Sequence, residues 1–376
     1  MTLQTQIGVS PAPAAKTTER ARVAVLYTSA NTAVRDIGRV MRLARYSDAL
    51  DKSAETLLKI NISWQRYYPA CSTSPWQLDG VVQALREDGY EKLTGAHNGT
   101  VVVNSHEGAD RNKHDAVLLK HGVPAVHLND DDVPWIRYEP RTEMLVLNEI
   151  FKDGIYIPQL FPGKNIVHMP TMKTHVFTTM TGAMKNAFGG LLNFKRHWTH
   201  SRIHETLVDL LAIQKEIHPG IVAVMDGTIA GDGPGPRAMR THVKNVILAS
   251  SDQVAIDATA ARMMGFDPLS IDFIRLATER GLGQGDPDLI DIEGLDISDV
   301  DFGFTRDEDT FASWGQKKIY WGPLKPFEGM LLRSPIVPWA YWASNFYYNV
   351  FWWNLFGRSQ VKSAMQTEWG KLFQSY

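Results

Sequence analysis

The sequence predicts an α/β fold in which helices cover both faces of a mostly parallel sheet, followed by an aromatic C-terminal extension. Three observations support this prediction. Short β-branched runs alternate with helical segments, which is typical of parallel strands joined by right-handed crossovers. The 376 residues are 44% hydrophobic and 21% charged, as in a globular protein with a large core. From Ser334 to Gly357 the chain has no charged residue but many aromatic ones.

The elements follow from local patterns. Apolar residues at helical spacing, such as Val34, Ile37 and Val40, predict helices, and Ser74-Pro75 is a typical helix start. We expect strands at 22–27, 56–62, 100–104, 125–128, 165–169, 221–225 and 244–249. We expect helices at 31–46, 75–88, 111–120, 199–217 and 271–279, and a further helix that Ser251 caps and that ends near Gly265.

Two segments do not fit this alternation. Residues 130–162 contain an acidic run, aromatic residues and prolines, which indicates an insertion or a hairpin. Residues 231–236 are rich in glycine and proline, which predicts a loop. We therefore expect a flexible N-terminal tail at 1–20, an α/β core at 21–320 and the aromatic extension at 321–376.

Composition excludes several classes of function. The net charge of −2 gives no general attraction to nucleic acid. The single cysteine, Cys71, excludes an intrachain disulfide and an iron–sulfur cluster bound by this chain alone. The N-terminus lacks the apolar stretch of a secretory signal. We expect a cytoplasmic protein, and association with a membrane surface is the alternative that the sequence leaves open.

Polar residues follow three of the predicted parallel strands. Asn61 lies at the end of the first of these strands, Lys173 and His175 follow the second, and Asp226 and Asp232 follow the third. In doubly wound sheets, ligands bind beyond the carboxyl ends of the strands. We therefore expect these side chains to surround one pocket.

The residue types indicate how this pocket would work. Lys173 can hold an anion, and His175 can transfer a proton near neutral pH. Asp226 or Asp232 can orient the histidine, act as a base or bind a divalent metal. The alternatives are a solvated lysine, a histidine bonded to the backbone, and a surface loop that carries the two aspartates.

The segment Thr181–Asn186 predicts the start of a helix. Thr181 can cap it, and Gly182 allows a ligand to approach the backbone. A helix N-terminus favours a phosphate or carboxylate, and Lys185 adds positive charge. The spacing is not that of a Walker A loop. An ordinary helix start with an exposed lysine is the alternative.

Three histidines, His197, His200 and His204, are separated by three and four residues. On a helix they would share one stripe and could bind a metal, with one of the two aspartates as a further ligand. An exposed polar face is the interpretation we favour. An anion clamp formed with Arg196 and Arg202 is a third alternative.

The aromatic segment Trp339–Phe356 is long enough for a membrane span, but its prolines, asparagines and tyrosines count against one. A helix lying in the membrane surface is more consistent with its tryptophans and tyrosines. Packing against the core or against a second subunit of a homo-oligomer is the other alternative.

The chain resembles the domain-of-unknown-function family number 362. The resemblance rests on KINIS, STSPWQLDGVVQALREDGY, NIVHMPTMKTHVFTTMTGAMKNAFGG, IHETLVDL, VMDGTIAGDGPGPR, ILASSDQVAIDATAARMMG and ERGLGQGD. It implies that the family-pattern positions of this chain include Lys59, Asn61, Lys173, His175, Lys185, Asn186, Asp226, Gly231, Gly233, Pro234 and Asp257. The resemblance therefore adds Lys59 and Asn186 to the residues that we expect to bind a substrate. Many relatives carry ferredoxin-type cysteine clusters, which this chain lacks.

We expect an enzyme that acts on a small or lipid-like substrate bearing a carboxylate or phosphate, by acid–base or metal-assisted chemistry. The substrate would be bound by five residues: Lys59, Asn61, Lys173, Lys185 and Asn186. The alternative is a non-catalytic anion-binding protein, peripheral to the membrane, that assists a biosynthetic or redox complex and docks through the aromatic segment.

Overall fold

The computed structural model describes residues 19–100, 103–332 and 345–376. Most of the predicted N-terminal tail, residues 1–18, lies outside the described residues. So does the first part of the aromatic segment, including Trp339.

The core is built on one mixed sheet with the strand order β12-β1-β11-β10-β7-β2-β3-β4. Strands β10, β7, β2, β3 and β4 are mutually parallel, and β1 is parallel to β12. Only β11 runs antiparallel to its two neighbours in this order, β10 and β1. The strands are β1 (Ala21–Tyr27), β2 (Thr56–Ile60), β3 (Leu93–His97), β4 (Ala125–His127), β5 (Trp135–Tyr138), β6 (Ile155–Pro158), β7 (Asn165–Met169), β8 (Thr171–His175), β9 (Thr179–Met180), β10 (Ile221–Asp232), β11 (Arg240–Ser250) and β12 (Ile290–Gly294).

Helices cover both faces of this sheet, as predicted, and each face has its own hydrophobic core. One core contains residues of α1 to α4, and the other contains residues of α5 to α9. The helices are α1 (Ala33–Leu43), α2 (Pro75–Glu87), α3 (Ser105–Arg111), α4 (His114–Lys120), α5 (Leu147–Ile150), α6 (Ala183–Leu191), α7 (Ile203–Ile217), α8 (Gln253–Met264), α9 (Asp272–Glu279), α10 (Phe311–Tyr320), α11 (Glu328–Leu332), α13 (Arg358–Ala364) and α14 (Glu368–Gln374).

Several local predictions are confirmed. Ser74 caps α2 by accepting a hydrogen bond from the Gln77 backbone N–H, and Gly265 ends α8 in the left-handed conformation. The predicted insertion is a hairpin of β5 and β6. The fold class is therefore the one that the alternation of strands and helices indicated.

The third strand was predicted in the wrong place. It is β3, Leu93–His97, whereas the expected strand at 100–104 includes two residues outside the described part of the chain. Its described neighbours Thr100 and Val103 form only an isolated bridge with each other. The reason is packing: a Cβ on Gly95 would lie 3.0 Å from Leu118 Cδ1, so β3 needs a glycine that its β-propensity does not favour.

Other boundaries also differ from the prediction. Asp252, and not Ser251, caps α8 by accepting hydrogen bonds from two backbone N–H groups. The expected helix at 111–120 begins only at His114. Strand β10 continues to Asp232 because β8 and β11 pair with its second half, and β12 was not predicted.

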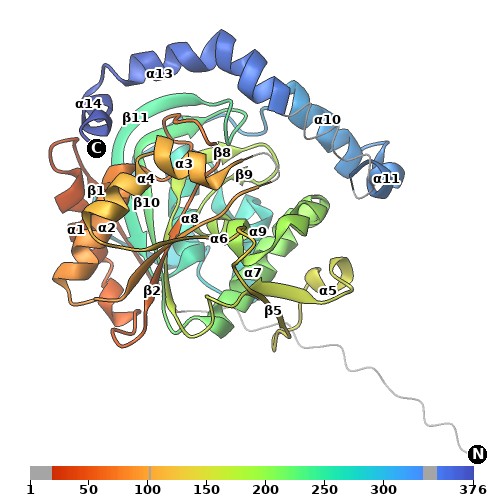
Figure 1. The fold of residues 1–376 in the computed structure, drawn as a ribbon, viewed down its shortest axis with the longest axis horizontal. Helices are drawn as coiled ribbons and strands as arrows, with labels where there is room; N and C mark the ends of the chain where they lie inside the picture. The colour runs from red at the N-terminus through yellow and green to blue at the C-terminus, as the bar shows by residue number, and fades with distance from the viewer. Residues whose placement is uncertain (1–18, 101–102, 333–344) are drawn as a thin grey trace, which may run out of the picture.

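The C-terminal helices form an arc along the end of the core that carries β8, β9 and α3 (Figure 1). The segment η6 (Tyr347–Gly357), a π-helix, packs there on an aromatic cluster. Trp64 lies 5.3 Å from Trp353, and Tyr68 lies 5.4 Å from Trp352 (ring centroids). Helix α14 then reaches α2, where Trp369 lies 5.0 Å from Trp76.

Candidate functional site

The candidate site lies at the carboxyl ends of the parallel strands. Strand β7 ends at Met169, and after Pro170 the chain continues as β8, which pairs with the second half of β10. This pairing places Lys173 beside Gly231. The loops after β2, β7 and β10 therefore do meet at one edge, as the sequence predicted.

A cavity of about 60 Å³ opens at this edge. Lys173 and Lys185, the lysines predicted to hold an anion, line it together with both predicted asparagines, and none of the described residues of its wall is an aspartate or glutamate. The lining residues are Asn61, Ser63, Pro170, Thr171, Lys173, Thr181, Gly182, Lys185, Asn186 and Pro236. The cavity is therefore polar, and its lining contributes positively charged groups.

Lys173 is buried, with its ammonium group held by neutral oxygens. It donates a hydrogen bond of 3.0 Å to the Cys71 carbonyl and another to the Thr171 hydroxyl. Burial lowers the pKa of Lys173 to about 8, partly opposed by the nearby Cys71 and Asp226. The same burial raises the pKa of the Cys71 thiol to about 11, so this cysteine is not a ready nucleophile.

Lys185 is half-buried on α6. Among the described residues, it has no hydrogen-bond acceptor or carboxylate partner, and its ammonium nitrogen lies 5.3 Å from the centre of the Phe188 ring. Burial lowers the pKa of Lys185 to about 7, with a smaller contribution from the positive charge of Lys173. A lysine in this state can both attract an anion and exchange a proton near neutral pH.

The N-terminus of α6 differs from the prediction. Gly182, not Thr181, is the N-cap residue. The carboxylate of Asp257, from α8, accepts hydrogen bonds from the backbone N–H groups of Ala183 (2.6 Å) and Met184 (3.0 Å). These two donors are therefore not available to a ligand. Burial raises the pKa of Asp257 to about 8, against the effect of these two hydrogen bonds.

The two asparagines are held in place by backbone atoms. Asn61 donates to the Cys71 carbonyl (3.2 Å) and accepts from the Ser63 hydroxyl. Asn186 donates to the Lys59 carbonyl at 2.9 Å. Lys59 itself is fully buried and donates to Asn98 Oδ1 at 2.8 Å, so it supports the cavity from behind and does not line it.

His175 lies outside the cavity wall, at the end of β8. Its Nδ1 accepts a hydrogen bond of 3.1 Å from the Phe177 backbone N–H and contacts the Thr178 hydroxyl. Burial, with a contribution from the positive charge of Lys185, lowers the pKa of His175 well below its usual value. The side chain is therefore a neutral imidazole bonded within its own turn.

The two predicted aspartates have other partners than His175. Asp226 accepts hydrogen bonds from the Ser74 hydroxyl (2.5 Å) and the Thr228 backbone N–H (2.7 Å). Asp232 forms an ion pair with Arg240 at 2.8 Å. Within the described chain, neither carboxylate bonds to His175, so the structure does not provide the expected carboxylate–histidine pair.

The three spaced histidines also do not converge. His200 stacks on Tyr320 with ring centroids 5.8 Å apart, and His204 Nδ1 accepts a hydrogen bond from the Phe273 backbone N–H. His197 and His200 lie on a 3₁₀-helix, not on α7. In the part of the chain that the structure describes, their ligand atoms do not form a group within 4.8 Å of one another.

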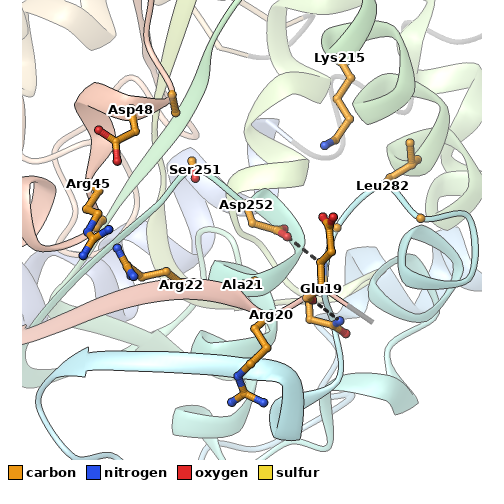
Figure 2. A pocket seen from close by; sticks show the side chains of 15 residues that line it. Glu19, Arg20, Ala21, Arg22, Arg45, Asp48, Lys215, Ser251, Asp252 and Leu282 are labelled. Carbon is orange, nitrogen blue, oxygen red and sulfur yellow. Dashed lines mark hydrogen bonds between the residues drawn. The ribbon is translucent and has the colours of Figure 1, made fainter. Parts of the chain in front are cut away.

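A second hollow, of about 490 Å³, lies at the opposite end of the sheet, beside the start of β1 (Figure 2). Charged groups of both signs surround it, including Arg22 and Arg45 with Asp48 and Asp252. Asp252 is already engaged as the cap of α8 and accepts a hydrogen bond from the Gln284 backbone N–H. This balance of charge contrasts with the two lysines of the smaller cavity.

Five residues of the cavity wall were not predicted to line it: Ser63, Pro170, Thr171, Thr181 and Pro236. Thr171 and Thr181 are joined across the wall, because the Thr181 hydroxyl donates to the Thr171 carbonyl at 3.1 Å. The sequence could have indicated both threonines, because Thr171 lies two residues before Lys173 and Thr181 lies directly before Gly182.

Comparison with known proteins gives a family and one distant relative. The profile of the family described as "Domain of unknown function (DUF362)" matches residues 56–262. A thylakoid-associated protein of Synechocystis is 24% identical over 234 residues, which cover 60% of this chain and 68% of the relative. No solved structure matches significantly.

Proposed function

This chain belongs to the family of the domain of unknown function 362, and we propose that it is an enzyme that binds the carboxylate or phosphate of a small or lipid-like substrate between Lys173 and Lys185. The family carries no assigned activity, so the proposal rests on the cavity. A single observation supports it most: two lysine side chains share a cavity that, in the described part of the chain, no aspartate or glutamate lines.

The size of the cavity fits this ligand class. A volume of about 60 Å³ is several times the roughly 10–15 Å³ that one water molecule needs, which leaves room for one carboxylate or phosphate group. The rest of the substrate would lie outside. Two cations with lowered pKa values favour an anion because its charge offsets their repulsion and their cost of burial.

The groups differ in role. Lys173 already donates two hydrogen bonds, so it would position the anionic group. Lys185, whose pKa of about 7 is close to the operating pH, would donate or accept the proton. Asn61 and Asn186, each fixed by a backbone carbonyl, would orient the substrate. This assignment replaces His175 as the proton carrier.

Calorimetric titration with inorganic phosphate and with acetate tests the binding step. We expect saturable binding of at least one anion by the wild-type chain and at least tenfold weaker binding by Lys173→Met, because a charged hydrogen bond contributes about 1.5–3 kcal/mol. Lys152→Met, a change at an exposed lysine, is the control and should bind like the wild type. Equal affinities for all three proteins would reject the anion site.

Incubation with a metabolite and lipid extract tests the catalytic step. Mass spectrometry should detect species that disappear with the wild-type chain but persist with Lys185→Met and with buffer alone. Binding of phosphate without any such turnover would favour a non-catalytic anion-binding protein.

A second candidate function is docking to a membrane surface through η6. One side of η6 is buried against the core. The other side, together with Phe346 directly before η6, exposes large apolar side chains: Phe346, Val350, Phe351, Leu355 and Phe356 are 46–57% exposed. The relative in Synechocystis is named as thylakoid-associated. Among the described residues, no helix is both long enough and apolar enough to span a bilayer, so docking would use the surface of the membrane.

The position of η6 connects this candidate to the cavity. Ser63 and Pro236 line the cavity. Their chain neighbours Trp64 and Arg237 contact η6: Trp64 Nε1 donates to Asn349 Oδ1 at 2.7 Å, and Arg237 lies over the Tyr348 ring at 5.1 Å. A membrane that contacted η6 would therefore lie close to the cavity and could supply a lipid-like substrate.

Flotation with liposomes tests the docking. The wild-type chain should float with vesicles, and the double variant Phe351→Ser/Leu355→Ser should stay in the dense fraction while keeping its thermal stability. Leu119→Ser, at an apolar side chain 84% exposed on α4, is the matched control and should float. Failure of the wild-type chain to float would reject this candidate.

A further inference from the structure

A second polar cluster lies at the same edge of the sheet, on strands β3 and β4. The last residues of these parallel strands, His97 and His127, are paired in register. Neighbouring residues of parallel strands project to the same side, and here the two imidazole rings stack with centroids 4.7 Å apart and an interplanar angle of 13°. Asp115, in the first turn of α4, reaches the same place.

These three side chains offer a set of metal ligands. One ring nitrogen from each histidine and one carboxylate oxygen of Asp115 lie within 4.8 Å of one another. In the described part of the chain, His97, His127 and Asp115 are the group of three or more potential metal ligands whose atoms lie this close together. Strand register and the first turn of α4, rather than flexible loops, hold the three residues.

The state of His97 points independently to a missing ligand. Its side chain is 0% exposed, and neither ring nitrogen has a hydrogen-bond partner among the described residues. Buried polar atoms in folded proteins are almost always paired. A bound ion would take the lone pair of one of these nitrogens.

The surrounding residues suit metal coordination. His127 Nδ1 bonds to the Ser105 hydroxyl at 2.8 Å, which leaves Nε2 for an ion and fixes the ring, as outer partners of metal-binding histidines do. His106 stacks on His127 with ring centroids 3.6 Å apart and bonds to Asp130. Asp115 forms no ion pair with any described residue, so no cation competes for its carboxylate.

We propose that His97, His127 and Asp115 bind a divalent first-row transition metal ion, with Zn²⁺ as the reference ion. Two imidazoles and one carboxylate match the ligands of zinc and related ions, whereas calcium and magnesium prefer oxygen ligands. Zinc bonds of about 2.0–2.2 Å require the stacked imidazole rings of His97 and His127 to rotate relative to each other, so that their in-plane lone pairs converge on one ion. The exposed side chain of Asp115 would move inward to complete the set. Three protein ligands leave a coordination position open.

This site is separate from the lysine cavity, and its test does not depend on the proposed function. The untagged full chain is freed of metal with a chelator and titrated with Zn²⁺ by calorimetry, and with Co²⁺ by visible spectroscopy. We expect one equivalent of ion per chain at micromolar affinity or tighter. We also expect Co²⁺ absorption bands of a four- or five-coordinate site.

Variants identify the ligands. Asp115→Asn changes an exposed side chain and should weaken Zn²⁺ binding at least tenfold. His97→Ala should abolish the Co²⁺ bands. Asp153→Asn, at an exposed aspartate in the turn before β6, is the control and should bind like the wild type. Absence of saturable binding, or equal binding by wild type and Asp115→Asn, would overturn the proposal and leave His97 paired with water.

Discussion

Replacement of Lys185 by methionine tests how the cavity holds its charge. Methionine keeps an unbranched apolar stem but removes the ammonium group, which has no acceptor among the described residues and lies near a second cation. We therefore expect this substitution to affect stability and ligand binding in opposite directions.

Without ligand, Lys185→Met should stabilise the fold. The pKa of Lys185 falls from 10.5 in the unfolded chain to about 7 in the folded protein, so the folded state disfavours the charged form. This penalty is fully present below about pH 7 and disappears as the pH rises towards 10.5. At 1.36 kcal/mol per pKa unit its upper bound is about 5 kcal/mol, and because solvent screens a half-buried group we expect about 1–3 kcal/mol.

With ligand, the same substitution should be unfavourable. A cation and an anion 4 Å apart attract by about 4 kcal/mol at an effective dielectric constant near 20, and desolvation offsets part of this. A net loss of about 1.5–3 kcal/mol corresponds to roughly 10- to 150-fold weaker binding of phosphate.

Thermal and urea denaturation at pH 6, 8 and 10, with and without phosphate, measure both effects. Lys152→Met is the control for the loss of one positive charge and should show neither. If Lys185→Met is less stable than the wild type at pH 6, or if its stability difference does not shrink towards pH 10, the account of the cavity is incorrect.

Three further predictions concern the cap of α6, the extension and pH. Gly182→Ala should cost about 2–4 kcal/mol in urea denaturation, because its Cβ would lie 2.2 Å from Asp257 Oδ1. Gly315→Ala, inside α10 with no atom within 4 Å, should be neutral or stabilise by up to about 1 kcal/mol, and equal losses would contradict the cap. Trp352→Ala, at a buried side chain, should lower stability by about 3–5 kcal/mol. Phe351→Ala, 48% exposed, should lower it by less than about 0.5 kcal/mol, and similar effects of the two variants would contradict the packing of η6. The affinity for sulfate, whose charge is constant over this range, should fall from pH 6 to pH 9 as lysines with pKa values of about 7 and 8 lose their protons, and a flat calorimetric profile would exclude them as the binding groups.

The elements that local sequence patterns specify were predicted well. Ser74 begins α2 as expected because a capping serine before proline needs only neighbouring residues. The meeting of Lys173, Lys185 and Asn61 was also predictable, since the parallel order of the strands brings their carboxyl ends to one edge.

Features that depend on distant parts of the chain were missed. Asp257 caps α6 from 74 residues further along the sequence, and no local pattern shows that its carboxylate occupies those N–H groups. In the same way, β3 is a weak strand in sequence that the packing of Leu118 on Gly95 makes possible. Because the strand was expected at 100–104, His97 was not recognised as a residue at a strand end.

The most direct test of the lysine cavity is a crystal structure of the protein with selenate, whose selenium is located by anomalous scattering. The account predicts an anomalous peak within hydrogen-bonding distance of both Lys173 Nζ and Lys185 Nζ, and its loss in Lys185→Met. Saturating selenate with no peak between the two ammonium groups would contradict it.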